Sequence, residues 1–315
     1  MDEEDVQSKK AKTAAFKRNG GIIMLIVLFI AALTVASAFI PAKTVNPVNI
    51  GFVSEPCTYC VYGLSLNNDS HFSVTAYSGY EDMISALDGG TLDAALMPAR
   101  YLDEEDSGKN TVVAITSLLN LTVVENGDSV YSIADLNERR IVLPESLKDS
   151  LEQRMLSTML ANADVSADIL FADDEAIKQM AQNKDIDIMA LPADQCAAVL
   201  AENENLRDCF SLADQWTSLM GSRPPADCSL VVRNEIIADR TDDMPAVLSA
   251  FKTSVDYLKS KHKKAAILVA SGDSSTDYNV IRETIPHCQF EYLDGDAMAE
   301  SLQELQVLKQ QINAS

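Results

Sequence analysis

The side chains that could carry out acid–base or metal chemistry are few and widely spaced. The chain has three histidines, His71, His262 and His287, and none has a partner at the spacing of a metal site. The sequence contains no nucleophile elbow, no phosphate-binding loop and no dinucleotide fingerprint. Paired acids at 173–174 and 242–243 are typical of helix starts rather than acid–base pairs. These patterns predict no catalytic residue, no metal and no cofactor.

Six cysteines are the other reactive groups. Cys57 and Cys60 have the spacing of a redox or metal motif, but no second pair and no nearby histidine completes a site. The alternatives are a short-loop disulfide or two unpaired thiols. Cys196 and Cys209 are close enough in sequence to staple the middle of the chain. Cysteines in this number fit an oxidising compartment without proving one.

A segment that occurs twice gives the clearest indication of architecture. Residues 83–99 align without a gap on residues 177–193. Each copy has the end of a helix, a turn, an acid, a short apolar strand and then Pro-Ala. We therefore expect two similar α/β lobes, with Pro98 and Pro192 on opposite sides of a shared cleft. Ligands of open α/β sheets bind at such a place, outside the carboxyl ends of the strands.

Strand and helix patterns alternate along the chain, which favours mainly parallel sheets flanked by helices. The expected strands are 49–53, 72–77, 92–97, 140–143, 169–171, 186–191, 209–211, 229–232 and 289–293. Residues 111–124 predict an extended crossover between the lobes, and Arg223 with the two following prolines marks a second one. Capping signals place helix starts at Ser78 and Ser146.

The N-terminus predicts export. Five lysines and arginines within residues 9–18 precede an uncharged apolar run over residues 21–40. A helix of about 20 residues matches a hydrocarbon core of ~30 Å, and the basic flank stays on the cytoplasmic side. The small residues at 36–38 also fit a signal-peptidase site, so the segment is an anchor or a cleaved signal.

Composition excludes one class of partner. The 315 residues are 47% hydrophobic, which is enough for one or two domains with real cores. The formal net charge of -22 repels nucleic acid, so no nucleic-acid partner is expected. Net charge does not fix the sign of a local cleft.

Several motifs in a fixed order resemble one family of binding proteins. They occupy residues 89–98, 132–144, 230–235 and 285–298. Their order and spacing are similar to those of the substrate-binding proteins of nitrate-, sulfonate- and taurine-class ABC transporters, over roughly residues 48–308. The chain departs from the family's lipid-anchored members, because no cysteine closely follows the apolar run.

The resemblance implies a two-lobed α/β fold of the type II periplasmic binding protein class, with an N-terminal transmembrane helix added here. The expected organisation is a cytoplasmic basic tail at 1–20, an anchor or signal segment at 21–40, a linker at 41–48, a first part of lobe one at 49–126, lobe two at 127–223, and a second part of lobe one at 224–315.

Loops at the strand ends supply the candidate ligand-binding residues. In lobe one they are Ser54, Glu55, Tyr77, Ser78, Gly79, Met97, Pro98 and Ala99, and in lobe two they are Ser146, Leu147, Lys148, Pro192, Ala193 and Asp194. Asn120 and Arg223 lie near the two crossovers. The simpler alternative for Ser78 and Ser146 is that they only cap helices. Trp216, the single tryptophan, fits a core position better than a ligand contact.

These features together predict a non-enzymatic, extracytoplasmic solute-binding component of an ABC importer. Its expected partners are a small organic solute, an ABC permease with its ATPase, and the membrane through the N-terminal helix. One alternative is a membrane-tethered sensor or partner-binding module on the same fold, with a cleft lined by apolar or self-filling side chains. Another is an enzyme on this fold, for which Cys57 is the one loop candidate.

Overall fold

The computed structural model describes residues 47–67, 71–102, 108–183 and 188–313. The predicted basic tail at 1–20, the predicted membrane or signal segment at 21–40 and linker residues 41–46 lie outside these ranges. Among the described residues, none of the helices combines the length and apolar character needed to cross a bilayer.

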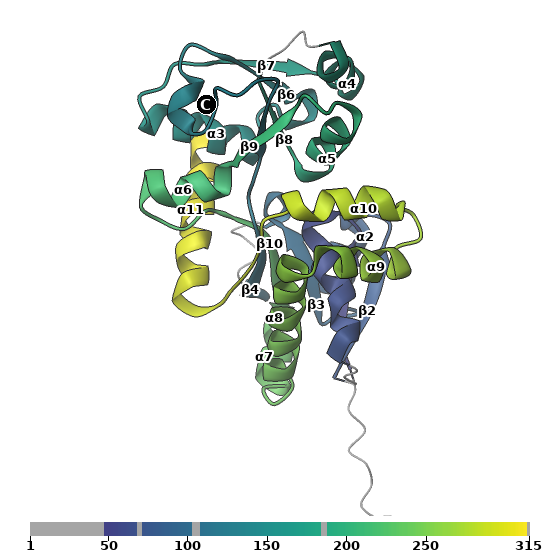
Figure 1. Ribbon diagram of the computed structural model, residues 1–315. Helices are drawn as coiled ribbons and strands as arrows, with labels where there is room; N and C mark the ends of the chain where they lie inside the picture. Colours follow the sequence, from purple (N-terminus) through teal and green to yellow (C-terminus); the bar gives the residue numbers. More distant parts are fainter. Residues whose placement is uncertain (1–46, 68–70, 103–107, 184–187, 314–315) are drawn as a thin grey trace, which may run out of the picture. The chain divides into compact units, whose positions relative to one another are not determined.

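Eleven strands in the described part of the chain form two sheets (Figure 1). The first sheet has the order β11 (Phe290–Leu293), β4 (Asn110–Leu118), β10 (Ala226–Arg233), β3 (Ala94–Pro98), β1 (Val48–Val53) and β2 (Phe72–Tyr77). The second has the order β7 (Asp168–Ala172), β6 (Arg140–Pro144), β8 (Ile188–Leu191), β5 (Thr122–Glu125) and β9 (Arg207–Ser211). The predicted alternation of strands and helices is confirmed.

The expectation of mainly parallel sheets is wrong, because both sheets are mixed. Strand β1 is parallel to β2 and β3, and β6 is parallel to β7 and β8. Strands β10, β4 and β11 run antiparallel in the first sheet, and β5 runs antiparallel to β8 and β9 in the second. Strands β10 and β5 each enter their sheet from the other sheet, and each runs opposite to the parallel strands beside it.

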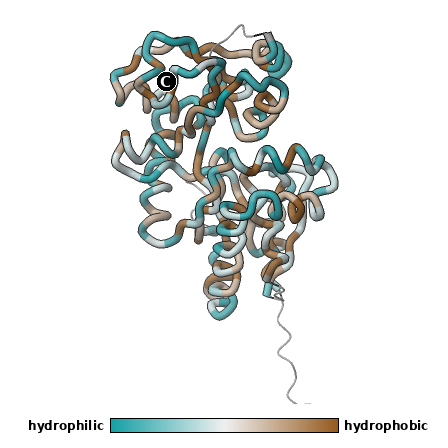
Figure 2. The backbone as a smooth tube through the Cα atoms, viewed as in Figure 1, coloured by the Kyte–Doolittle hydropathy of each residue, from teal (hydrophilic) through white to brown (hydrophobic). Residues whose placement is uncertain are grey.

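Helices cover both sheets (Figure 1). Around the first sheet they are α2 (Tyr80–Asp88), α7 (Asn234–Asp239), α8 (Met244–Ser260), α9 (His262–Gly272), α10 (Tyr278–Thr284) and the 3-10 helix η1 (Pro56–Asn67). Around the second they are α3 (Leu151–Asn162), α4 (Asp174–Asn183), α5 (Ala193–Glu202) and α6 (Leu212–Met220). Figure 2 shows hydrophobic and hydrophilic residues alternating along these helices, as expected when one face packs on a core.

The described parts of the repeated segment fold as predicted, and the turn and acid of the second copy, at 184–187, lie outside the described residues. Helix α2 leads into β3, which ends at Pro98 in the first sheet, and α4 leads into β8, which Pro192 follows in the second sheet. Both strands are fully buried and both are parallel to a central neighbour. The two prolines therefore belong to different sheets, as the sequence predicted.

The chain links the two sheets in three places. Residues 111–124, predicted as an extended crossover, instead form most of β4 and β5, which lie in different sheets and are joined by residues 119–121. The segment from α6 to β10 is the second predicted crossover. The sequence did not predict a third link, formed by α11 (Gly295–Asn313) after β11. Leu305 and Leu308 of α11 are buried in the same core as Met155 and Leu156 of α3. The C-terminal helix thus ties the first sheet to the helical layer of the second.

Two predicted helix starts are wrong. Helix α2 begins at Tyr80 behind Gly79, and no side chain caps it, so Ser78 is not its cap. Residues Glu145–Leu147 form a short 3-10 turn instead of the start of α3. Asp149 then takes a left-handed conformation (φ 61°), and α3 starts only behind Ser150, whose hydroxyl accepts a hydrogen bond from the Gln153 amide at 3.2 Å. Ser146 is therefore exposed in a turn rather than at a helix N-terminus.

Candidate functional site

A cavity of about 210 Å³ is lined by residues that belong to both sheets. Glu55 follows β1, Arg100 follows β3 and Pro192 follows β8. These are carboxyl ends of parallel strands, where α/β sheets place their ligands. We call this space the cleft cavity. It is smaller than the ~300–1,000 Å³ of sites for drug-sized ligands, which favours a small solute.

An ion pair with aromatic support forms the first-sheet rim of the cleft cavity. Both Arg100–Glu55 hydrogen bonds use one guanidinium nitrogen, which lies 2.8 and 3.0 Å from the two carboxylate oxygens. The Tyr80 hydroxyl donates to the same carboxylate. Tyr80 stacks on Tyr101 at 4.3 Å between ring centroids, and Arg100 lies about 5 Å from both rings. Burial and the neighbouring acidic groups raise the pKa of Tyr80, so its hydroxyl stays a donor to Glu55.

A second carboxyl group lies deeper in the cavity. Asp227, near the start of β10, accepts one hydrogen bond from the Ser117 hydroxyl of β4 at 3.2 Å. Burial, with the negative charges of Glu152 and Glu55, raises the pKa of Asp227 to about 7. This carboxyl group is therefore poised to change its charge near neutral pH.

The second sheet supplies the opposite wall. Pro192 precedes α5, so the free backbone amides at the start of that helix adjoin the cavity, together with Ala193 and Asp194. Glu152 comes from the first turn of α3. His287 closes one end and lies 3.2 Å from Asp208 of β9, an ion pair that joins the two sheets when the histidine is protonated.

Five of the predicted ligand-binding residues line the cleft cavity: Glu55, Asn120, Pro192, Ala193 and Asp194. Ala99, Ser146 and Leu147 line an adjoining cavity, which shares Arg100, Leu119, Glu152 and Asp227 with the first. Met97 lines a separate apolar pocket under α11. For these positions the structure gives location only, and ligand contact remains a prediction.

The other candidates lie elsewhere among the described residues. Ser54 donates to Asp273 at 2.8 Å, and Arg223 pairs with Glu300 at 3.2 Å. Pro98 is a buried strand residue paired with Cys228. Tyr77 ends the edge strand β2, Ser78 and Gly79 follow it, and Lys148 is exposed on a turn. None of these four residues lines the cavities described above.

Sequence reasoning missed Arg100, Glu152 and Asp227. Arg100 lies one residue beyond the predicted Pro-Ala loop, and Glu152 follows the real start of α3. Asp227 was not predicted because it lies at the beginning of the antiparallel strand β10, whereas ligand-binding residues were expected only where strands end at the cleft. The sequence signal for it is an acid in an otherwise apolar strand, 226–232.

All six cysteines are free thiols in the structure. The disulfide that Cys196 and Cys209 could have formed is not present, because both are free thiols. Cys57 lines the cleft cavity and donates to Glu55 at 3.3 Å, whereas Cys60 is buried in the core of the first sheet. The two therefore do not act as one motif. Trp216 is also a core residue, and its indole N–H donates to Ser222 at 3.2 Å.

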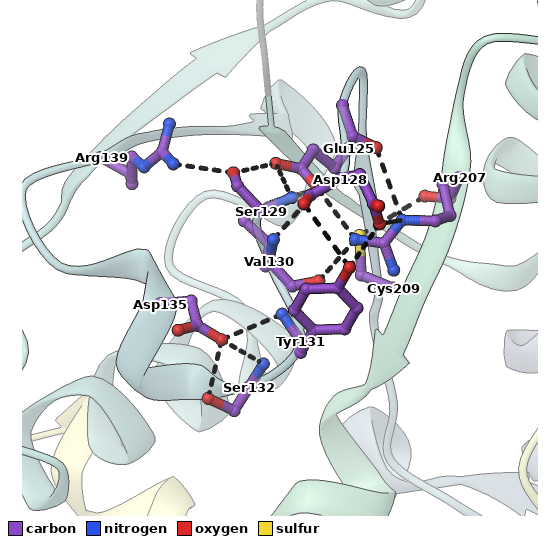
Figure 3. Close-up of polar contacts among 11 residues, drawn as sticks. Glu125, Asp128, Ser129, Val130, Tyr131, Ser132, Asp135, Arg139, Arg207 and Cys209 are labelled. Atoms are coloured by element: carbon purple, nitrogen blue, oxygen red, sulfur yellow. Dashed lines mark hydrogen bonds and ion pairs between the residues drawn. The ribbon is translucent and has the colours of Figure 1, made fainter.

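A second acidic cluster lies on the second sheet, outside the cleft cavity (Figure 3). Glu125 of β5 is 2% exposed and accepts hydrogen bonds from the Ser129 and Val130 amides at 2.9–3.1 Å. The Arg207 guanidinium of β9 donates to it at 2.9 Å. Burial alone raises the pKa of Glu125, but the bonds from Ser129, Val130 and Arg207 outweigh it, and the net pKa is lowered. This cluster is a satisfied structural ion pair.

Comparison with solved structures shows the same fold in transport proteins. An ABC transporter protein from Parabacteroides distasonis has a TM-score of 0.65 at 13% identity, covering 84% of this chain and 92% of that one. The periplasmic aliphatic sulphonate binding protein of Escherichia coli has a TM-score of 0.60 at 13% identity, with the same coverage. A putative nitrate transport protein of Thermoplasma volcanium has a TM-score of 0.53 at 14% identity, covering 85% and 94%. No protein-family model and no curated protein matches the sequence.

The structural neighbours thus include an ABC transporter protein, a sulphonate binding protein and a putative nitrate transport protein, in line with the class that the sequence motifs resemble. At this identity the comparison establishes the fold, a two-sheet α/β architecture of the periplasmic binding protein type. The function has to be argued from the cleft.

Proposed function

We propose that this protein is the extracytoplasmic solute-binding component of an ABC importer, which captures a small organic solute in the cleft cavity. The observation that carries the proposal is a polar cavity bounded by strand ends of both sheets, within a fold that solved ABC-transporter binding proteins share. The polar lining supports retained ligand binding, since the sensor alternative calls for an apolar or self-filled cleft.

Capture requires movement between the sheets. The β4–β5 connection and the segment between α6 and β10 would act as hinges, because they are short and are not paired in either sheet. The closed form then presents one surface to a permease whose ATPase lies inside the cell. No covalent step is required, in keeping with the scarcity of catalytic groups.

A thermal-shift screen of the full chain tests the role. Amines, sulfonates, pyrimidines and small inorganic anions are each added in excess, because a ligand that binds only the native state raises the melting temperature by mass action. We expect one class of compound to raise the melting temperature. The rise should be smaller in Pro192→Leu, because the larger side chain reduces the volume of the cavity. If no class has an effect, the importer role is wrong and the sensor alternative gains.

A further inference from the structure

The cleft cavity holds an excess of negative charge. Four carboxyl groups line it, from Glu55, Glu152, Asp194 and Asp227. Among the described residues, Glu55 is the one member of this set with an ion pair, which it forms with Arg100. The other three come from three different elements: α3, the start of α5 and β10.

The basic groups near the cavity are already engaged. Arg100 uses its guanidinium on Glu55 and lies against the rings of Tyr80 and Tyr101. His287 lines the cavity, and its imidazole lies 3.2 Å from the carboxylate of Asp208, a residue that does not line it. Lys309 does not line the cleft cavity. It lines the adjoining cavity and the pocket under α11, and its ammonium donates to the Leu102 carbonyl oxygen. Among the described residues Asp227 therefore has no ion pair, and the charge of Arg100 only partly offsets its raised pKa.

Burial makes the charge of Asp227 costly. A carboxylate removed from water loses hydration, and one hydrogen bond from Ser117 replaces only part of it. Burial and the nearby charges of Glu152 and Glu55 disfavour the ionised form of Asp227. They therefore raise its pKa, and the group keeps its proton to higher pH. A positive group placed at Asp227 removes that cost, whereas an anion adds to it.

We infer that the solute of this cleft carries a cationic group, an ammonium or guanidinium, which pairs with Asp227 and is flanked by Glu152 and Asp194. This inference rests on the proposed solute-binding function and narrows it to a substrate class. It also separates this chain from the structural neighbours whose names state sulphonate and nitrate, because both of those are anions. Arg100 and its two tyrosines form the rim, where a second polar group of the solute meets an existing ion pair.

Isothermal titration calorimetry on the full chain tests the inference. The probes are 1,4-diaminobutane, ethylammonium, choline and guanidinium as chlorides, against sodium methanesulfonate and sodium nitrate. We expect at least one cation to bind and neither anion to do so. Asp227→Asn should weaken cation binding at least tenfold, and Glu152→Gln should weaken it severalfold. Asp256→Asn, on the exposed face of α8, changes the net charge equally and should leave binding unchanged.

The outcomes separate the inference from the function beneath it. Binding of an anion without any cation overturns the cationic class but keeps the solute-binding role. If none of the six probes binds and no compound in the wider thermal screen stabilises the protein, both the cationic class and the solute-binding role are overturned. Cation binding that Asp256→Asn weakens as much as Asp227→Asn does would assign the effect to net charge, and the inference fails. Glu152→Gln keeps the test valid if the Asp227 variant folds poorly.

Discussion

Glu125 is a buried carboxyl group and Asp227 a half-buried one, and their surroundings are opposite. Glu125 accepts hydrogen bonds from backbone amides, from the Ser129 hydroxyl and from the Arg207 guanidinium, and its pKa is lowered. Asp227 accepts one hydrogen bond, from the Ser117 hydroxyl, and lies near the carboxylates of Glu152 and Glu55. Its pKa is raised to about 7. Glu125 lies within one sheet, whereas Asp227 lines the cavity that both sheets border.

The difference separates a structural charge from a binding charge. A buried charge whose partners come from its own chain holds neighbouring strands and loops in register, as Glu125 does between β5 and β9. A buried charge without such a partner destabilises the free protein and becomes favourable only when something from outside supplies the opposite charge. Strongly perturbed acids in a cleft are accordingly candidates for function.

Glu125→Ala should produce the largest loss of stability. The variant leaves Arg207, the buried Val130 amide and the Ser129 amide without their acceptor, and because Arg207 is partly exposed the loss should be about 3 kcal/mol, the low end for a broken buried pair. The free energy of unfolding is measured by urea denaturation of the full chain at pH 7. Asp256→Asn should stay within ~0.5 kcal/mol of the parent. A loss below 1 kcal/mol for Glu125→Ala would show that the cluster is not structural.

Asp227→Asn should stabilise the protein, in contrast to Glu125→Ala. The pKa of Asp227 in the folded protein, about 7, exceeds the unfolded value of ~3.9. The native state therefore binds this proton more tightly, and the contribution of Asp227 to stability falls as pH rises from about 4 to 7 and is flat above. Removing the charge should raise the free energy of unfolding by about 1 kcal/mol at pH 8, a value reduced for solvent screening.

The same variant should lose the pH dependence that Asp227 causes. Urea denaturation at pH 5 and pH 8 compares the parent with Asp227→Asn, and the gain should be present at pH 8 and small at pH 5. The charged groups facing Asp227 are Glu152, Glu55 and Arg100, so Glu152→Gln should give a smaller gain of the same sign. Destabilisation by Asp227→Asn at pH 8 is the contrary result.

Ser129→Ala tests a single bond of the satisfied cluster. The Ser129 hydroxyl donates to Glu125 and accepts from Arg139 at 2.8 Å. We expect a loss of about 1 kcal/mol in the free energy of unfolding, with solute binding unchanged because the residue lies outside the cleft cavity. A change in cation affinity for this variant would mean that the two acidic regions are coupled.

Arg100→Gln should have the smallest effect on stability and a distinct effect on binding. The ion pair is half exposed on the arginine side, so its loss should cost less than ~1 kcal/mol. Glu55 then becomes a further uncompensated acid, and the affinity for 1,4-diaminobutane should rise about threefold. Arg223→Gln, which removes an ion pair outside the cavity, is the matched control. Weaker cation binding in Arg100→Gln would place the solute against the guanidinium instead.

The fold was predictable because its signals are local and repeated. The helix–turn–strand–proline pattern recurs around Pro98 and Pro192, and each copy encodes one buried strand parallel to its neighbour. Strand direction was not predictable, because β10 and β5 take their orientation from where the chain enters a sheet. The path of α11 across to α3 likewise depends on tertiary packing, which an amphipathic pattern does not specify.

The candidate site was predictable only where strand ends define it. Glu55, Pro192 and Asp194 follow parallel strands and were found, whereas Ser146 was misplaced because its turn is 3-10 and α3 starts at Ser150. The sequence did not indicate Asp227, because an acidic residue in a strand is normally expected to face solvent. Its role depends on the groups that surround it in the folded protein. These are Ser117 of β4, Glu152 of α3 and Glu55 in the loop after β1.

The most direct test of this contrast is the number of protons exchanged when 1,4-diaminobutane binds the full chain at pH 6. Calorimetric titrations in two buffers with different ionisation enthalpies give that number. Asp227 is mostly protonated at pH 6, so pairing with a cation should release about one proton, while Glu125 is already ionised and contributes none. The account predicts this release in the parent protein and its loss in Asp227→Asn. Binding without proton release, or equal release in both proteins, would contradict it.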